Sequence, residues 1–102
     1  MSSRVYCIAA FKPKPGKEQE LFRVLQALES DTLREDGCIQ YRVTRHVDSP
    51  FAGGHSFPLV FNEIWADMAS FEAHCVSPDG LVTEHNVCIY TDEPEDFDAP
   101  RF

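Results

Sequence analysis

The sequence predicts an α+β fold in which four strands and two helices follow one another as β-α-β-β-α-β. Four segments are rich in the β-branched and aromatic residues that are typical of strands. Two segments between them repeat apolar residues at helical spacing. The chain has 102 residues, the size of one domain, and 43% of them are apolar, which is enough for a packed core.

The first half of the chain predicts a strand, a helix and a second strand. Residues 4–12 are β-forming, and a helix is expected over 17–35, with Glu29 on its solvent face. The buried stripe of this helix is expected to contain Leu21, Val24, Leu25, Leu28 and Thr32. Gly37 supplies the helix stop. Residues 38–47 alternate in polarity and predict the second strand. One face of this strand is expected to carry Ile39, Tyr41, Val43 and Val47.

The second half predicts a strand, a helix and a last strand. Residues 57–65 form the third strand, which is largely apolar on both faces. Asp67 is a good N-cap for a second helix that extends to about Val76. The buried stripe of that helix is expected to contain Met68, Phe71 and Cys75. A short helical turn is expected over 78–84, and residues 86–91 predict the fourth strand.

This order is that of the ferredoxin-like fold, a four-stranded antiparallel sheet with two helices on one face. We expect one such domain over 1–91 and an acidic C-terminal tail over 92–102. Two helices cover only one face of the sheet, whereas the first and third strands are apolar on both faces. Exposed apolar patches usually mark interfaces. We therefore expect a homodimer that is formed through the open sheet face.

The charge of the chain excludes some partners. The net charge is −8, and residues 92–102 supply −4 of it from five acids and one arginine. Such a chain is not expected to bind nucleic acid or an anionic membrane, because both require clustered cations. No apolar run approaches the roughly 20 residues of a membrane span. No convincing secretory signal is present, so we expect a cytoplasmic protein. The four cysteines, Cys7, Cys38, Cys75 and Cys88, are widely spaced and are expected to be reduced core thiols.

Three segments carry a resemblance to a known family. They are 12–17 (KPKPGK), 36–41 (DGCIQY) and 63–74 (EIWADMASFEAH). In this order they resemble the antibiotic biosynthesis monooxygenase family over roughly residues 4–90, and the resemblance implies a dimeric α/β barrel. Two features depart from its relatives. The haem-degrading branch has an Asn in its first strand, where this chain has only 5–10 (VYCIAA), and the loop 50–56 is longer than is common in the family.

The resemblance implies a cofactor-independent monooxygenase that acts on a quinol-like or other small aromatic substrate with O₂. A deprotonated, electron-rich ring can pass an electron to O₂ directly, so neither a cofactor nor a metal is expected. The histidines give no metal-ligand spacing. Three alternatives remain open. They are haem binding or degradation through His85 or His74, a small-molecule isomerase, and a non-catalytic dimer that binds a ligand.

His74 and Asn62 are the candidate catalytic residues. His74 lies one helical turn after Phe71, and its titration range suits proton transfer near neutral pH. The alternative for His74 is a structural hydrogen bond to a carbonyl or to Glu63. Asn62 interrupts an apolar strand and could hold a substrate oxygen or bond across the dimer seam. By strand parity, Asn62 and Trp65 should not line one pocket.

Four aromatic or imidazole side chains are candidate substrate contacts, namely Trp65, Phe71, Tyr41 and His55. Trp65 and Phe71 would supply an aromatic wall, Tyr41 a hydrogen bond, and His55 a contact from the Gly-Gly loop. Core packing or simple exposure is the alternative for each of them. Glu63 shares the Trp65 face and is expected to be a structural carboxylate, paired with Arg42, Arg45 or a backbone donor.

Overall fold

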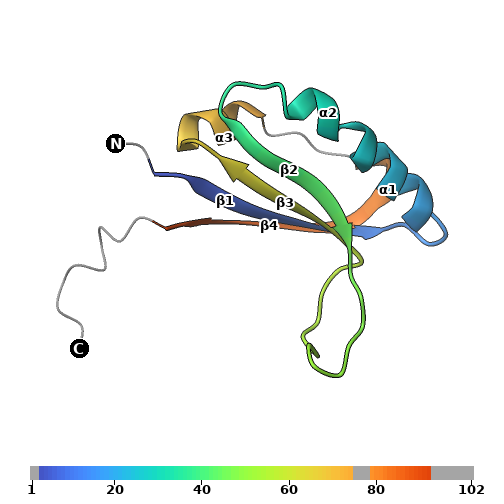
Figure 1. Cartoon of the computed structure of the whole chain (residues 1–102). Coiled ribbons are helices and arrows are strands. Elements are labelled where there is room, and N and C mark those ends of the chain that lie inside the picture. The colour runs from blue at the N-terminus through green and yellow to red at the C-terminus, as the bar shows by residue number, and fades with distance from the viewer. Residues whose placement is uncertain (1–2, 75–78, 93–102) are drawn as a thin grey trace, which may run out of the picture.

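The computed structural model describes residues 3–74 and 79–92 and confirms the expected order of elements (Figure 1). The elements are β1 (Val5–Pro13), α1 (Glu18–Ala27), α2 (Glu29–Thr32), β2 (Cys38–Arg45), β3 (Leu59–Trp65), α3 (Met68–His74), the 3-10 turn η1 (Asp79–Leu81) and β4 (Val82–Thr91). The expected helix end at Cys75 and Val76, and the acidic residues after Asp92, lie outside the described residues.

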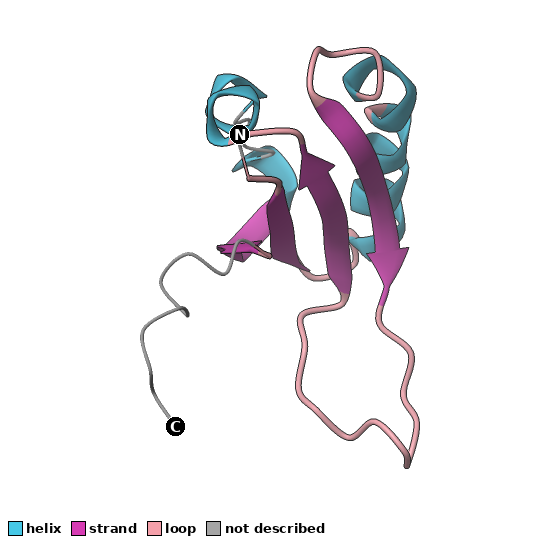
Figure 2. Cartoon of the chain, turned by 60° about the vertical axis from the view of Figure 1, so that its left-hand side comes forward, coloured by secondary structure: helices cyan, strands magenta, loops and turns pink. Residues whose placement is uncertain are grey.

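The strands form one antiparallel sheet in the order β2-β3-β1-β4. The central strands β1 and β3 pair from Val5 with Trp65 to Phe11 with Leu59. The helices of the described residues lie together over one face of this sheet (Figures 1 and 2). This arrangement is the ferredoxin-like fold.

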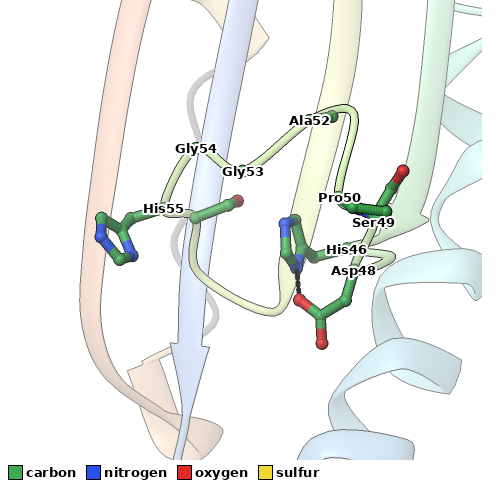
Figure 3. A pocket seen from close by; sticks show the side chains of 9 residues that line it. His46, Asp48, Ser49, Pro50, Ala52, Gly53, Gly54 and His55 are labelled. Carbon is green, nitrogen blue, oxygen red and sulfur yellow. Dashed lines mark ion pairs between the residues drawn. The ribbon is translucent and has the colours of Figure 1, made fainter.

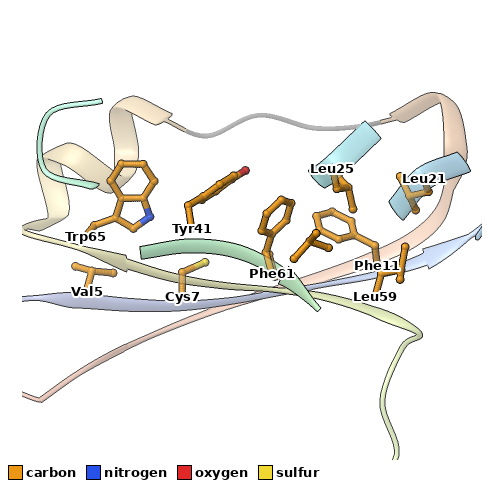
Figure 4. Close-up of a cluster of buried hydrophobic side chains, with 11 residues drawn as sticks. Val5, Cys7, Phe11, Leu21, Leu25, Tyr41, Leu59, Phe61 and Trp65 are labelled. Carbon is orange, nitrogen blue, oxygen red and sulfur yellow. The ribbon is translucent and has the colours of Figure 1, made fainter. Parts of the chain in front are cut away.

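The core lies between that sheet face and the helices. Side chains alternate along β1 and β3, so every second residue is buried beneath the helices. The buried apolar side chains are Val5, Cys7, Ala9, Phe11, Leu21, Leu25, Tyr41, Val43, Leu59, Phe61 and Trp65 (Figure 4). Glu63 occupies an inward position of the same row and is buried as well.

The first helical segment is not continuous, and the prediction of one helix over 17–35 was wrong. The helix divides at Leu28, whose N–H donates to the Leu25 carbonyl three residues back. Glu29, expected on the solvent face, is half-buried, and its Oε2 accepts a 2.9 Å hydrogen bond from the backbone N–H of Val43. The break therefore allows α2 to bond the outer edge of β2, while Thr32 remains buried.

Four further expectations differ from the structure. Val47, expected to share the Tyr41 and Val43 face of the second strand, lies after the end of β2 and is 77% exposed. Ile39 is exposed because the β2–β3 register shifts between Cys38 and Gln40, which changes the alternation at the start of β2. Met68 is exposed rather than part of a buried stripe. β4 begins at Val82, four residues earlier than expected, because its pairing with β1 continues as far as Pro13.

The connection between β2 and β3 protrudes from the sheet. Strand pairing ends at Arg45 with Leu59, and residues 46–58 extend beyond that point as a long loop (Figures 1 and 2). Within this loop, Phe51 is 98% exposed. Among the described residues, no helix has the length and apolar character needed to cross a membrane.

Candidate active site

A cavity of about 480 Å³ lies between the helix-bearing face of the sheet and the helices α1 and α3. Its apolar lining consists of Ala9, Phe11, Val24, Leu25, Leu28, Phe61, Phe71 and Val87. The other residues that line it are Cys7, Tyr41, Glu63, His74 and His85. A mostly apolar cavity with a few polar groups is typical of a site for a small organic ligand.

The cavity explains why part of the apolar stripe predicted for the first helix is not buried. Leu21 and Leu25 are enclosed, whereas Val24 and Leu28 stay exposed although they belong to the same apolar face. Val24 and Leu28 line the cavity together with Val87 from β4. The helix therefore uses part of its apolar face for the core and part for this cavity.

His74 lies in the last turn of α3 and has one partnered and one unpartnered nitrogen. Its Nδ1 lies 3.0 Å from Oε1 of Glu35. Its side chain is only 8% exposed, and Nε2 is buried without a hydrogen-bond partner among the described residues. The ring packs against two aromatic rings, with centroid distances of 4.9 Å to Tyr41 and 4.8 Å to Trp65. Because buried polar atoms are usually paired, this unpartnered Nε2 requires an explanation.

Trp65 is completely buried and does not appear among the residues that line the cavity. Its indole N–H donates a 2.9 Å hydrogen bond to Oε1 of Glu63. Trp65 therefore supports His74 and Glu63 from the core, and the aromatic lining comes instead from Phe11, Tyr41, Phe61 and Phe71.

Glu63 is a buried carboxylate, and its observed partner is the Trp65 indole rather than Arg42 or Arg45. Burial raises the pKa of Glu63, because an apolar environment disfavours the charged form. Hydrogen bonds from Trp65 and Cys7 and an electrostatic interaction with His74 lower this pKa and so oppose part of the increase.

Tyr41 is buried at the cavity and stacks on Phe61, with ring centroids 4.3 Å apart. Burial raises the pKa of its phenol, and the charges of Glu63 and Glu35 raise it further. The hydroxyl is therefore protonated at neutral pH and can donate a hydrogen bond.

The structure separates Asn62 from the other candidates. Its side chain points to the opposite sheet face, where its amide donates a 3.0 Å hydrogen bond to Oγ1 of Thr44. That hydroxyl in turn donates to the Val60 carbonyl at 2.8 Å. The expectation that Asn62 and Trp65 lie on different faces agrees with this geometry.

His55 lies in the protruding loop and does not line the cavity. It borders a separate, open hollow of about 500 Å³ in the loop (Figure 3). In the same hollow, Nδ1 of His46 lies 3.7 Å from Oδ1 of Asp48.

Sequence reasoning missed Glu35 and Cys7 as site residues and considered His85 only as a haem ligand. Glu35 lies 39 positions before His74, so only tertiary packing brings the two together. Cys7 and His85 come from β1 and β4 and line the cavity beside Glu63. In the described part of the chain, no group of three or more His, Cys, Asp or Glu residues could hold a metal ion.

Comparison with known proteins agrees with this geometry. Residues 4–81 match the family described as "Antibiotic biosynthesis monooxygenase". The chain belongs to this family. The antibiotic biosynthesis monooxygenase match covers β1 to η1, and thus most of the residues that line the cavity. No curated protein matches the chain.

Solved structures support the same fold. A protein from Shewanella oneidensis is 30% identical, with a TM-score of 0.73 over 89% of this chain and 92% of that one. A dimeric, ferredoxin-like protein from Bacteroides fragilis is 9% identical, with a TM-score of 0.68 over 86% and 95% of the chains. The haem degrader MhuD from Mycobacterium tuberculosis, whose structure has two haems in its active site, is 13% identical, with a TM-score of 0.65 over 85% and 93%. The last two likenesses concern the fold alone.

Proposed function

We propose that this protein is a cofactor-independent monooxygenase that acts on a quinol-like or other small aromatic substrate with O₂. The observation that carries the proposal is the buried, unpartnered Nε2 of His74 at an apolar cavity of about 480 Å³. Membership of the antibiotic biosynthesis monooxygenase family supports it. A cavity of this size and apolar character suits a compact aromatic compound.

In this proposal, His74 removes the proton from a phenolic hydroxyl of the substrate. The phenolate then passes an electron to O₂, and the two radicals combine at a ring carbon. His74 returns its proton to the peroxide formed in this way. Loss of water from the hydroperoxide then leaves a quinone, so one oxygen atom enters the product and the other leaves as water. The apolar walls exclude bulk water, and the Tyr41 hydroxyl is a donor for charge that develops on a substrate oxygen.

The test is substrate-dependent oxygen uptake with a panel of quinols and hydroxylated polycyclic aromatics. We expect His74→Gln to lower kcat/KM by roughly 10²- to 10⁴-fold, the usual contribution of general acid–base catalysis. The matched control is His46→Gln, which removes a histidine in the protruding loop and should leave the rate unchanged. Absence of uptake across the panel, or full activity of His74→Gln, would contradict the proposal. Product formation without oxygen uptake would favour an isomerase.

Haem binding is the second candidate function, because His74 and His85 line the same cavity. The fold that the chain shares with MhuD is compatible with this alternative. Titration with haemin distinguishes the two functions. A Soret shift that His85→Ala abolishes would favour haem, whereas the monooxygenase proposal expects none.

We also propose that the chain forms a homodimer through the open sheet face. Ile8 and Tyr90 are 38% and 57% exposed there, and Val60 and Ile64 are half-buried. Burial of this apolar surface against a second copy would stabilise the assembly.

Ile8→Glu should convert the dimer to a monomer, because it places a charge at the centre of this face on β1. Sedimentation analysis measures the mass directly. Val47→Glu, at a position 77% exposed in the protruding loop, is the control and should stay dimeric. A wild-type monomer at micromolar concentration would refute the dimer.

A further inference from the structure

We propose that Glu35 is a positioning residue that holds His74 with its Nδ1 protonated, so that the cavity receives a neutral ligand through a ligand hydroxyl donating to Nε2. This inference rests on the proposed function, since it uses the same cavity. Glu35 would determine which nitrogen of His74 carries the proton. The ligand would then have to be a hydrogen-bond donor.

The contact between Glu35 and His74 defines which nitrogen carries the proton. Nδ1 of His74 lies 3.0 Å from Oε1 and 3.3 Å from Oε2 of Glu35. A carboxylate only accepts hydrogen bonds, so the imidazole must donate from Nδ1. In a neutral ring, Nε2 then carries a lone pair and no hydrogen. The unpartnered Nε2 is therefore a buried acceptor that lacks a donor, and a ligand hydroxyl would supply that donor.

The local fold fixes the position of Glu35. The turn from Glu35 to Cys38 is closed by a 3.1 Å hydrogen bond from the Cys38 N–H to the Glu35 carbonyl. The Gly37 carbonyl accepts a 2.7 Å hydrogen bond from the N–H of Ala66, just after β3. Ser70 of α3 packs directly on Gly37. The turn is thus anchored between β3 and the helix that carries His74.

The orientation of the imidazole is fixed by its aromatic neighbours. Tyr41 meets the ring edge-on, at an interplanar angle of 77°. Trp65 packs against the same ring at an interplanar angle of 34°. Because both neighbours are buried, the ring cannot easily turn to exchange its two nitrogens. Nε2 is thereby held in the buried position where the structure leaves it without a partner.

The charges around the cavity disfavour an anionic ligand. His74 is surrounded by Glu35 from the turn, Glu63 from β3 and Tyr41 from β2, while Cys7 and His85 face the cavity from β1 and β4. No lysine or arginine of the described residues lines the cavity. A ligand that arrived as an anion would meet the carboxylate charge of Glu63 without a compensating cation. A neutral hydroxyl compound avoids this repulsion.

The same arrangement assists proton removal. When the ligand O–H bond breaks, its electron pair stays on the oxygen and an N–H bond forms from the lone pair of Nε2, so neither group is oxidised or reduced. The imidazolium that results carries a positive charge beside the Glu35 carboxylate, which stabilises it. The ligand oxyanion then lies beside a cationic ring instead of a neutral one. Glu35 therefore acts through His74 and need not contact the ligand.

The experiment uses 2-naphthol and its methyl ether, which have the same ring system and differ in the hydroxyl hydrogen. Calorimetric titration of the full chain should show 2-naphthol binding about tenfold more tightly than the ether, the usual value of one buried hydrogen bond. In Glu35→Leu this preference should fall to near unity, while the ether binds as before. Glu35→Asp should retain part of the preference, and Asp36→Asn, which alters the neighbouring carboxylate, should retain all of it.

The protonation of His74 is measured independently of any ligand. ¹⁵N NMR of the imidazole nitrogens, assigned with His74→Gln, should show the proton on Nδ1 in the wild type and mainly on Nε2 in Glu35→Leu. A wild-type proton on Nε2, or an unchanged naphthol preference in Glu35→Leu, would overturn the role of Glu35 and leave the monooxygenase proposal intact. Failure of both compounds to bind the wild type would instead overturn the assignment of the cavity.

Discussion

Replacement of Trp65 by alanine should destabilise the protein by about 3–5 kcal/mol, the usual cost of removing a buried large aromatic side chain. Trp65 is fully buried, packs on His74 and Tyr41, and donates its indole hydrogen to Glu63. The substitution leaves a void and a buried carboxylate with one donor fewer. Domains of this size have a free energy of unfolding of about 5–15 kcal/mol, so the loss is a large part of the total.

The more informative substitution is Trp65→Phe, because it keeps an aromatic ring and removes the hydrogen bond. The bond lowers the pKa of Glu63, so its loss raises that pKa further above the reference value of 4.5. A raised carboxyl pKa in the folded state destabilises the protein at high pH and has no effect below the unfolded value. The stability loss should therefore be larger at neutral pH than at about pH 4, below that value.

Urea denaturation at the two pH values measures this difference. The control is the same substitution in a Glu63→Gln background, which has no carboxyl group to titrate. There the cost of Trp65→Phe should no longer depend on pH. An equal cost at both pH values in the wild-type background would show that the indole hydrogen bond does not stabilise the charged form of Glu63.

Substitution of Gly37 by alanine should have the second large effect. Gly37 has a φ of 84°, and a Cβ built there would collide with the side chain of Ser70 on α3. A left-handed backbone costs roughly 1–2 kcal/mol for a residue with a Cβ, and forced overpacking typically costs 1–3 kcal/mol more. We expect a total loss of about 3 kcal/mol, together with reduced activity, since the same turn carries Glu35.

Gly16 offers a matched comparison. It also has a positive φ, of 75°, but no atom lies within 4 Å of a Cβ built there. Gly16→Ala should therefore show only the backbone part of the loss in thermal or urea unfolding. In the Gly37→Ala variant, the further substitution Ser70→Gly removes the side chain that collides with the new Cβ. It should restore the part of the unfolding free energy that the collision costs, once the effect of Ser70→Gly alone has been subtracted. Equal losses at the two glycines would mean that α3 moves aside at little cost.

The fold could be predicted because its elements obey short-range periodicity. The alternation along β3 correctly placed Glu63 and Trp65 inward and Asn62 on the other face. Periodicity does not register local irregularity, which is why the exposure of Ile39 at the register shift escaped prediction. The break at Leu28 escaped it too. The residue directly after the break, Glu29, bonds a strand that follows later in the chain, and periodicity does not register such a contact.

The candidate site was only partly accessible from the sequence. The structure brings Tyr41, Phe71 and His74 to one cavity. All three had been proposed as site residues. Trp65 shares their side of the sheet, but parity cannot tell a core position from a cavity wall. Glu35 carried no signal of its own, since an acidic residue before a glycine turn is usually solvated. Its role depends on where α3 docks, which only the assembled fold defines.

The contact between α2 and β2 has a consequence for how this sheet can grow. β2 and β4 are the two edge strands, and edge strands can accept an added strand through their free backbone groups. On β2, the Glu29 carboxylate already occupies the Val43 N–H. A strand arriving there would have to displace a charged side chain, whereas most of β4 is exposed. Among the described residues, the two edges of the sheet therefore differ, since the β2 edge resists the addition of a strand and the β4 edge does not.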